Sequence, residues 1–418
     1  MTDGTVYVVG AGLAGLSSAV ALAAKGARVT LIEGAGQAGG RCRSYFDTTL
    51  DQVIDNGNHL VLSGNHATYA YLGTIGAVER LAGPELARFA FADVKTGERW
   101  TIAPNEGPLA WWVLMKNRRV PGSRLSEYLS IAKLLAPPRG KRIDEVIACK
   151  GPLWEKLLAP FLLAALNTEP EAASAELAGA IIRETLAKGG RAYRPRIASP
   201  TLGAAFIEPA LAYLAAKGAD VRLGRRLRSI GFDGNRIATL DFADGPLTLT
   251  AADRVVLATP AWATQDLVPG VSAPNEFRSI VNAHFSVPAP AGAAAMTGVI
   301  GGTAEWVFAF HDRLSVTVSG ADAIVDTDRE TLAKTLWHDV AAVHGLGPEL
   351  PPWQIVKERR ATFAATPEQA ARRASARTRW SNLILAGDWT ATGLPATIEG
   401  AIRSGHRAAE LALAPASV

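Results

Sequence analysis

Apolar runs separated by glycine-rich turns mark the start of the chain. Thr5 to Val9 is a continuous apolar, β-rich run, which is typical of a strand buried in a parallel sheet. Leu13 to Ala24 is built from small, helix-compatible residues, and Lys25-Gly26 ends the predicted helix. Arg28 to Ile32 predicts a second strand. This strand–helix–strand order favours a parallel sheet covered by helices.

The rest of the chain alternates between predicted helices and predicted strands. From about Leu86 to Pro200 the pattern is mainly helical and rich in large apolar residues, and about Val268 to Pro367 forms a second insertion of strands with one helix near Thr331 to His344. Further strands or hairpins are predicted at Ala219 to Leu227, Ile237 to Thr250, Arg254 to Pro260, Trp306 to Phe310, Leu314 to Ser319 and Leu383 to Ala386. Thr397 is the predicted N-cap of a last helix that runs to about Leu413.

The composition narrows the class of protein. A hydrophobic content of 48% and a charged content of 20% describe a globular chain, and 418 residues favour two domains. The net charge of +4 is dispersed, so no nucleic-acid partner is expected. Cys42 and Cys149 are the only cysteines and the histidines lack metal-ligand spacing, so neither a disulfide framework nor a metal site is predicted. A cytoplasmic protein without a transmembrane helix is expected.

The first turn has the glycine spacing of a dinucleotide-binding site. Gly10 allows a tight turn, Gly12 lets the backbone approach a pyrophosphate, and Gly15 lets the helix pack on the sheet. The helix N-terminus then points free N–H groups at the phosphates. Glu33 follows the last glycine by 18 residues, close to the distance of about 20 at which a carboxylate binds the adenosine ribose. Together these residues predict a site for an adenine dinucleotide.

Two further blocks favour FAD over a nicotinamide cofactor. Gly39-Gly40 frees the backbone to pass close to a ligand, while Arg41 and Arg43 place cations near the expected pyrophosphate. At the other end of the chain, Gly387-Asp388 forms a turn into a polar site after a strand. The positive end of the helix capped by Thr397 would favour the negative charge of a reduced flavin. No cysteine lies near this block, so we expect the FAD to be bound non-covalently.

The expected fold class is therefore α/β. A discontinuous, Rossmann-type FAD-binding domain is predicted from residues 1–85, 201–267 and 368–418. An inserted α+β domain, formed by residues 86–200 and 268–367, is predicted to bind the substrate.

The motifs also resemble a known group of proteins. The glycine turn, Glu33, Gly39-Gly40-Arg41, Val255 to Pro260, and Gly387-Asp388 with Thr397-x-Glu399-Gly400-Ala401 resemble the amine oxidase and phytoene desaturase superfamily of flavoproteins, nearly end to end. The resemblance implies FAD and a hydrophobic tunnel that leads to it. The residues expected to contact the cofactor are Gly10, Gly12, Leu13, Ala14, Gly15, Glu33, Gly34, Gly40, Arg41, Asn56, Gly57, Asn58, His59, Leu227, Gly387, Asp388, Ala396, Thr397, Ile398 and Ala401.

Within this superfamily the chain is similar to the squalene-associated flavoenzymes of bacterial hopanoid synthesis. Asp55 to Leu60, Ala165 to Ala175 and Gly387 to Thr397 carry that similarity. It implies an isoprenoid substrate and reductive removal of the hydroxyl group of a thirty-carbon alcohol. A departing hydroxyl group needs a proton or a strong hydrogen bond, and His59 is the candidate catalytic donor. A histidine hydrogen-bonded for purely structural reasons is the alternative at this position.

Two more segments leave alternatives open. Asn167 and Thr168 either line the mouth of the tunnel or form a turn before Pro170, and the structural role is favoured. Trp111 to Met115, followed by Lys116, Arg118 and Arg119, suits either peripheral attachment to the inner face of the cell membrane or a buried helix.

The residues alone also leave the reaction open. A carotenoid-type desaturase or isomerase would use the same flavin motifs in the oxidising direction, and a flavin-bearing lipid carrier would use them without turnover. The electron donor and the oligomeric state are not determined by the sequence.

Overall fold

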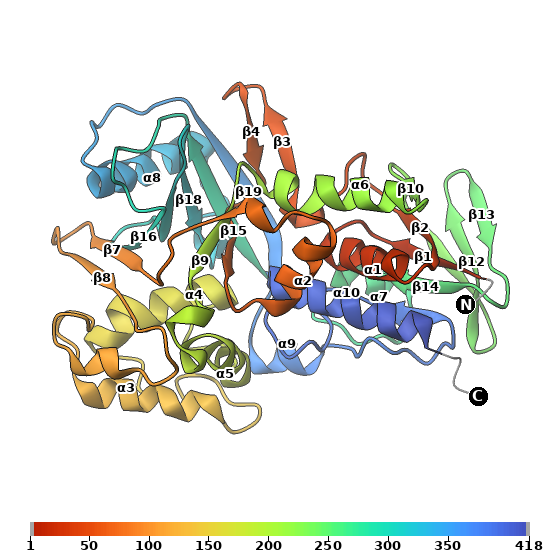
Figure 1. Ribbon diagram of the computed structural model, residues 1–418, viewed down its shortest axis with the longest axis horizontal. Helices are drawn as coiled ribbons and strands as arrows, with labels where there is room; N and C mark the ends of the chain where they lie inside the picture. The colour runs from red at the N-terminus through yellow and green to blue at the C-terminus, as the bar shows by residue number, and fades with distance from the viewer. Residues whose placement is uncertain (1–3, 415–418) are drawn as a thin grey trace.

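A five-stranded parallel sheet forms one half of the molecule. The computed structural model describes residues 4–414, and the sheet has the strand order β10-β2-β1-β14-β20. Its strands are β1 (Thr5–Val9), β2 (Arg28–Ile32), β10 (Asp220–Arg222), β14 (Arg254–Leu257) and β20 (Leu383–Leu385). The predicted strands and the predicted parallel sheet are confirmed, although β10 is shorter than expected. Strands far apart in the sequence thus meet in one sheet, as Figure 1 shows.

Helices cover one face of this sheet and a β-meander covers the other. Alternate side chains such as Val8 and Leu31 pack with the helices, whereas Val9 and Leu257 pack with the meander. The helices are α1 (Leu13–Ala24), α2 (His66–Thr74), α6 (Glu208–Ala216) and α10 (Ile398–Leu413). The meander consists of β11 (Ser229–Asp233), β12 (Arg236–Phe242) and β13 (Gly245–Thr248). Burial on both faces explains the continuous apolar runs of the strands.

Helices α1 and α10 lie very close to each other. A Cβ atom added to Gly405 of α10 would lie 2.2 Å from the carbonyl oxygen of Ala14 in α1. The Ser17 hydroxyl also contacts the Ile402 carbonyl at 3.4 Å. Only glycine allows this approach, and it brings the two ends of the chain together.

A seven-stranded sheet forms the core of the second half. Its order is β19-β15-β18-β17-β16-β7-β8, and helix α8 (Arg329–His344) packs on one face. The strands are β7 (Phe89–Asp93), β8 (Arg99–Ile102), β15 (Phe277–Phe285), β16 (Met296–Ile300), β17 (Trp306–Ala309), β18 (Leu314–Val318) and β19 (Trp353–Phe363). Strands β7 and β8 correct the expectation of a mainly helical stretch after Leu86, because their short alternating runs lie between turns.

Shorter elements connect the two halves. Helices α3 (Leu125–Ile131), α4 (Ala159–Leu166) and α5 (Ala175–Glu184) form a helical layer, while α7 (Ala261–Leu267) and α9 (Pro367–Ala371) lie near the parallel sheet. Strands β3 (Ser44–Asp47) and β4 (Gln52–Asp55) form a hairpin, and β5 (Leu60–Leu62), β6 (Leu81–Ala82) and β9 (Pro195–Ala198) form a small sheet. That small sheet joins segments assigned to both predicted domains, and the division into domains stays a prediction.

Candidate active site

The glycine turn after β1 has the geometry that its sequence predicts. Gly10 has a φ of +105°, and a Cβ there would lie 2.5 Å from the Ala258 carbonyl oxygen. A Cβ on Gly15 would lie 1.8 Å from the carbonyl oxygen of Gly10, so the helix reaches the turn only without a side chain. Gly12 differs, since a Cβ there would meet no atom within 4 Å. Gly10 and Gly15 therefore serve the fold, whereas Gly12 faces open space at the start of α1.

A second glycine segment lies beside the first. The Gly39 N–H donates to the Ala11 carbonyl oxygen at 2.8 Å, and Gly39 forms a β-bridge with Gly12. A Cβ on Gly40 would lie 3.3 Å from the Gly12 Cα. Two backbone segments without side chains therefore border the N-terminus of α1. This cradle fits a pyrophosphate, because backbone N–H groups and the helix dipole both favour an anion there.

Glu33 closes the other side of the glycine turn. Its carboxylate accepts hydrogen bonds from the N–H groups of Ala11, at 2.7 Å, and Ala35, at 2.8 Å. Next to it, the backbone of Gly34 lies close to Arg226, and Leu227 follows in the buried core. Glu33 thus holds the turn in shape at the carboxyl end of β2, which is the position expected for a ribose-binding carboxylate.

Arg41 and Asp388 join the two ends of the site. The Arg41 guanidinium donates to both carboxylate oxygens of Asp388, at 2.8 and 2.7 Å, and to the Ala361 carbonyl oxygen at 2.5 Å. Asp388 is buried, and its neighbour Gly387 donates its N–H to the Ser404 hydroxyl of α10 at 2.8 Å. Both bonds to Asp388 come from one guanidinium nitrogen, Nη2, and these charge-assisted bonds join the early arginine and the late aspartate into one element.

The N-terminus of α10 lies beside this element. Thr397 accepts a hydrogen bond from the Gly400 N–H at 3.0 Å, which confirms the predicted N-cap. Glu399 in the first turn is buried, and its carboxylate accepts from the Thr68 N–H, the Thr68 hydroxyl and Arg403. The first turn also contains Ile398 and Ala401, with Ala396 just before the cap, which are three of the expected cofactor residues.

The turn that carries His59 lies on the seven-stranded sheet. The Asp55 carbonyl oxygen accepts from the His284 ring at 3.0 Å, and the Asn58 side chain donates to the Thr317 hydroxyl at 3.1 Å. A Cβ on Gly57 would lie 2.8 Å from the Asn282 side-chain nitrogen, so a larger residue there would displace the end of that amide. Asn56, within the turn, donates to Glu358 of β19 at 3.4 Å. The turn therefore lies directly against β15, β18 and β19.

Burial sets the charge state of the histidines in this region. Burial, together with the nearby Arg41 cation, lowers the pKa of His59 to about 4. Burial also lowers the pKa of His284 to about 3. Both rings are neutral at pH 7, so His284 donates Nε2–H to Asp55 and accepts from the Ser315 hydroxyl at Nδ1. His59 forms no hydrogen bond with any side chain or backbone group in residues 4–414.

Several polar residues of this sheet were missed by the sequence analysis. Asn282, His284, Ser315 and Thr317 alternate with apolar residues that pack under α8, so they all face the His59 turn. Arg313 is also buried there, with its guanidinium 4.0 Å from the Phe310 ring centroid. The alternation of polar and apolar residues was the only local signal, and it gives no indication of the partner segment.

Asn167 and Thr168 have structural roles. Asn167 ends α4 in the left-handed conformation, with a φ of 47°. Its side chain donates to the Thr362 hydroxyl at 2.9 Å and accepts from the Gly320 N–H at 2.7 Å. Thr168 accepts from the Ala365 N–H at 2.8 Å. Both residues fix α4 to the end of β19, as the favoured alternative expected.

The two tryptophans of the possible membrane segment differ in their exposure to solvent. Trp112 is buried and packs edge-on against Tyr128, with ring centroids 5.8 Å apart. Trp111 is 50% exposed. No helix within residues 4–414 is long and apolar enough to cross a membrane. In the same range, no three His, Cys, Asp or Glu side chains come together as metal ligands would.

Comparison with known proteins identifies the family. The family model described as flavin containing amine oxidoreductase matches residues 13–413. A hydroxysqualene dehydroxylase from Rhodopseudomonas palustris is 52% identical over 411 residues, which are 98% of each chain. The chain belongs to the hydroxysqualene dehydroxylase family. A second hydroxysqualene dehydroxylase, from Zymomonas mobilis subsp. mobilis, is 48% identical over 97% of this chain and 98% of that one.

Solved structures of more distant proteins share the fold. The structure of cyclohexylamine oxidase from Brevibacterium oxydans IH-35A is 14% identical in sequence and has a TM-score of 0.71. The match covers 98% of this chain and 99% of that one. The resemblance to the amine oxidase superfamily and the α/β fold class predicted from the sequence are therefore confirmed. Membership of the hydroxysqualene dehydroxylase family also agrees with the finer similarity carried by Asp55 to Leu60 and Ala165 to Ala175.

Proposed function

We propose that this chain binds FAD non-covalently and removes the hydroxyl group of hydroxysqualene reductively to give squalene. Identity of about half the residues with hydroxysqualene dehydroxylases over nearly the whole chain is the observation that carries this proposal. The site supports it, because two glycine segments leave open space beside the N-terminus of α1, and the ion pair of the partly exposed Arg41 with the buried Asp388 joins them to α10. When bound, reduced FAD supplies the hydride that replaces the hydroxyl group.

Each part of the cradle has a defined task in holding the cofactor. Gly12 and Gly40 would let the pyrophosphate approach the backbone, and Glu33 would accept hydrogen bonds from the ribose. The N-terminus of α10, capped by Thr397, would place positive partial charge beside the flavin ring. Arg41 would neutralise nearby negative charge while it stays fixed by Asp388.

The reaction also needs a proton for the departing oxygen. The carbon–oxygen bond breaks, hydride joins the carbon, and the oxygen leaves as water after it gains a proton. His59 lies in the turn that packs on the sheet, and its ring has no protein partner within residues 4–414. With a pKa near 4, the ring is neutral at pH 7. We therefore assign His59 as a hydrogen-bond donor to the oxygen, with water as the source of the proton.

Product analysis tests the function directly. The purified protein, with chemically reduced FAD and hydroxysqualene under anaerobic conditions, should form squalene with one oxidised FAD for each molecule. In D₂O, where the N–H groups of reduced flavin exchange with solvent, one deuterium per molecule should appear at the carbon that carried the hydroxyl group. Double bonds introduced into phytoene-like substrates, with no squalene formed, would show a desaturase instead. Binding of isoprenoids without any redox change would show a carrier.

We further propose that the protein attaches to the inner face of the cell membrane. Within residues 4–414, seven of the thirteen exposed large hydrophobic side chains lie between residues 109 and 135. We call these the apolar foot: Leu109, Trp111, Leu114, Met115, Leu125, Leu129 and Leu135. The same segment contains five cations and one carboxylate. Leu125 and Leu129 of the foot belong to α3, which Figure 1 shows at the opposite end of the molecule from both termini.

Charge and apolar area together favour an anionic bilayer over a neutral one. Apolar side chains enter the lipid while surrounding lysines and arginines contact acidic headgroups, each worth about 1 kcal/mol near the surface. Vesicles with anionic lipid should therefore retain the protein, and neutral vesicles should retain less. Trp111→Ser with Leu114→Ser should reduce retention, whereas the matched control Leu223→Ser, exposed on the other half of the molecule, should not. Equal retention of all three proteins would contradict the role of the apolar foot in membrane attachment.

A further inference from the structure

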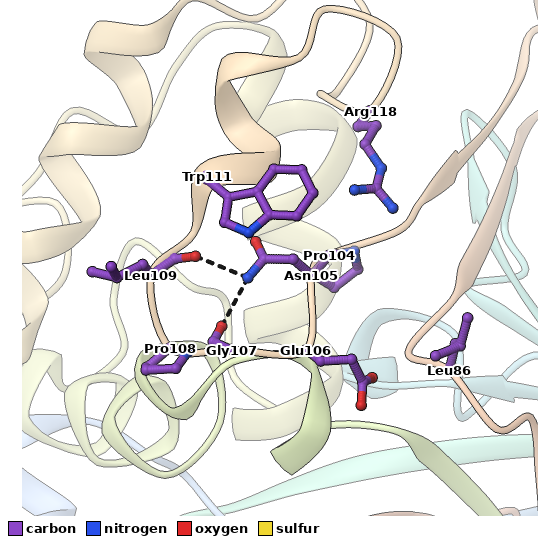
Figure 2. Close-up of a pocket in the computed structure, with 9 residues that line it drawn as sticks. All are labelled: Leu86, Pro104, Asn105, Glu106, Gly107, Pro108, Leu109, Trp111 and Arg118. Carbon is purple, nitrogen blue, oxygen red and sulfur yellow. Dashed lines mark hydrogen bonds between the residues drawn. The ribbon is translucent and has the colours of Figure 1, made fainter.

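An open pocket lies at the edge of the apolar foot. Its volume is about 590 Å³, within the roughly 300–1,000 Å³ typical of small-molecule sites. Figure 2 shows its lining, in which Leu109 and Trp111 of the foot lie on one side, Leu86 on the opposite side and Arg118 at the border. The guanidinium of Arg118 lies 5.3 Å from the centroid of the Trp111 ring. The pocket thus has mainly apolar walls, with the Glu106 carboxylate in its lining and the Arg118 cation at its rim.

The wall of this pocket is held firmly in place. The Asn105 side chain, which is buried, donates to the carbonyl oxygens of Gly107, at 3.0 Å, and Leu109, at 2.9 Å, as Figure 2 shows. It also accepts from the Trp112 N–H at 3.3 Å. Behind the wall, a Cβ on Gly189 would lie 2.1 Å from the Gly107 carbonyl oxygen. A loop fixed by three hydrogen bonds from one amide forms a lasting hollow rather than a transient gap.

The chain behind the wall leads directly to the His59 turn. The Gly190 N–H donates to the Asn105 carbonyl oxygen at 2.9 Å. Three residues later, Tyr193 is buried and stacks on Phe89, with ring centroids 6.3 Å apart. The next residues form β9, which pairs with β5, and β5 begins at the residue after His59. The pocket is therefore connected to the His59 turn through the segment that leads into β9, in which Tyr193 packs on Phe89 and Arg194 pairs with Glu106 of the pocket lining.

We propose that this pocket is where the isoprenoid chain of the substrate leaves the bilayer and starts toward the flavin. The inference rests on the proposed function. The apolar foot around it would place the opening in the lipid, where a thirty-carbon isoprenoid alcohol resides. From the pocket the chain would follow the stacked rings of Phe89 and Tyr193 toward β5. Arg118 at the rim would keep the opening at the level of the headgroups.

Narrowing the pocket separates uptake from chemistry. Leu86→Trp should fill part of the pocket, and the matched control Leu223→Trp places the same side chain at a distant exposed leucine. With hydroxysqualene presented in vesicles, Leu86→Trp should raise KM by about tenfold, equivalent to about 1.4 kcal/mol. It should leave kcat, FAD content and vesicle retention unchanged. An unchanged KM in Leu86→Trp, with the control also unchanged, would overturn the proposal.

A second measurement does not depend on turnover. A photoreactive isoprenoid alcohol with a diazirine, incorporated in the same vesicles, should label peptides from residues 86–118, and Leu86→Trp should suppress that labelling. Labelling confined to other peptides would place uptake elsewhere. If these peptides of the wild-type protein are labelled but the protein forms no squalene from hydroxysqualene, the uptake site is supported and the proposed reaction is wrong. If squalene forms while other peptides are labelled, the proposed reaction is supported and the uptake site at this pocket is wrong.

Discussion

Replacement of Gly12 by alanine separates cofactor binding from folding. The glycine has a φ of −73°, which alanine adopts without strain, and the new methyl group would meet no protein atom within 4 Å. Gly12→Ala should therefore change the stability of the FAD-free protein by no more than about 0.5 kcal/mol. The same methyl group would occupy the space beside the first N–H groups of α1. Loss of two charge-assisted hydrogen bonds, at about 1.5–3 kcal/mol each, would weaken FAD binding by at least about a hundredfold.

The assay compares four purified proteins. The flavin absorbance retained after gel filtration and the Kd for added FAD report cofactor binding, while thermal unfolding of the FAD-free protein reports stability. Gly36→Ala is the control, because that glycine is exposed and also has open space, and it should behave as wild type. Gly15→Ala should lose stability, since its methyl group would lie 1.8 Å from the Gly10 carbonyl oxygen. Wild-type FAD affinity in Gly12→Ala would refute the placement of the pyrophosphate at Gly12.

Three other predictions follow from single side chains. Glu33→Ala should weaken FAD binding by about 1.5–3 kcal/mol in a fluorescence titration, because a charged hydrogen bond to the ribose is lost, and unchanged affinity would assign Glu33 only to the shape of the turn. His59→Ala should keep FAD yet slow squalene formation by about 10²–10³-fold, as expected for the loss of one hydrogen-bond donor to the departing oxygen, and unchanged turnover would make the histidine structural. Burial raises the pKa of Glu305 to about 7, so the folded protein binds a proton more tightly than the unfolded chain, and stability should fall as pH rises from about 4.5 to 7. Glu305→Gln should remove that decline in denaturant titrations and stabilise the protein at pH 8 by about 1–3 kcal/mol, whereas parallel pH profiles of both proteins would contradict the burial argument.

Local patterns predicted the cofactor half of the molecule well. Thr5–Val9, Leu13–Ala24 and Arg28–Ile32 were predicted with the bounds that the structure has, because a continuous apolar run, a run of small residues and a Lys-Gly stop each act within a few positions. The last helix was equally well defined, since Thr397 caps it as expected. Spacing alone also anticipated that Gly12 would differ from Gly10 and Gly15, which the space around each glycine bears out.

The second half was harder to predict because its main sheet buries polar side chains. Strand β15 contains Asn282 and His284, and β19 contains several charged residues, so neither has the apolar pattern typical of a core strand. Their inner face is buried by a turn more than 200 residues away in the sequence, as the contact between Asp55 and His284 shows. Single-sequence patterns do not report such pairings. They also did not separate Trp111 from Trp112, because one residue of rotation along the chain decides which ring faces solvent.

The seven-stranded sheet divides its inner face between two kinds of surface. Toward β19 and β15, the face carries Asn282, His284 and Thr317, whose burial is offset by hydrogen bonds with one another and with the His59 turn. Toward β16 and β7, the face is aromatic, with Trp306 packed edge-on against Phe91. The two surfaces meet in register where Trp306 pairs with Thr317. An isoprenoid alcohol has the same division, an apolar chain that ends in one polar group. Because Asn282, His284 and Thr317 already bond to one another and to the turn, a substrate chain on the aromatic part of the face would bring its hydroxyl group to the turn itself, where the His59 ring has no protein partner within residues 4–414.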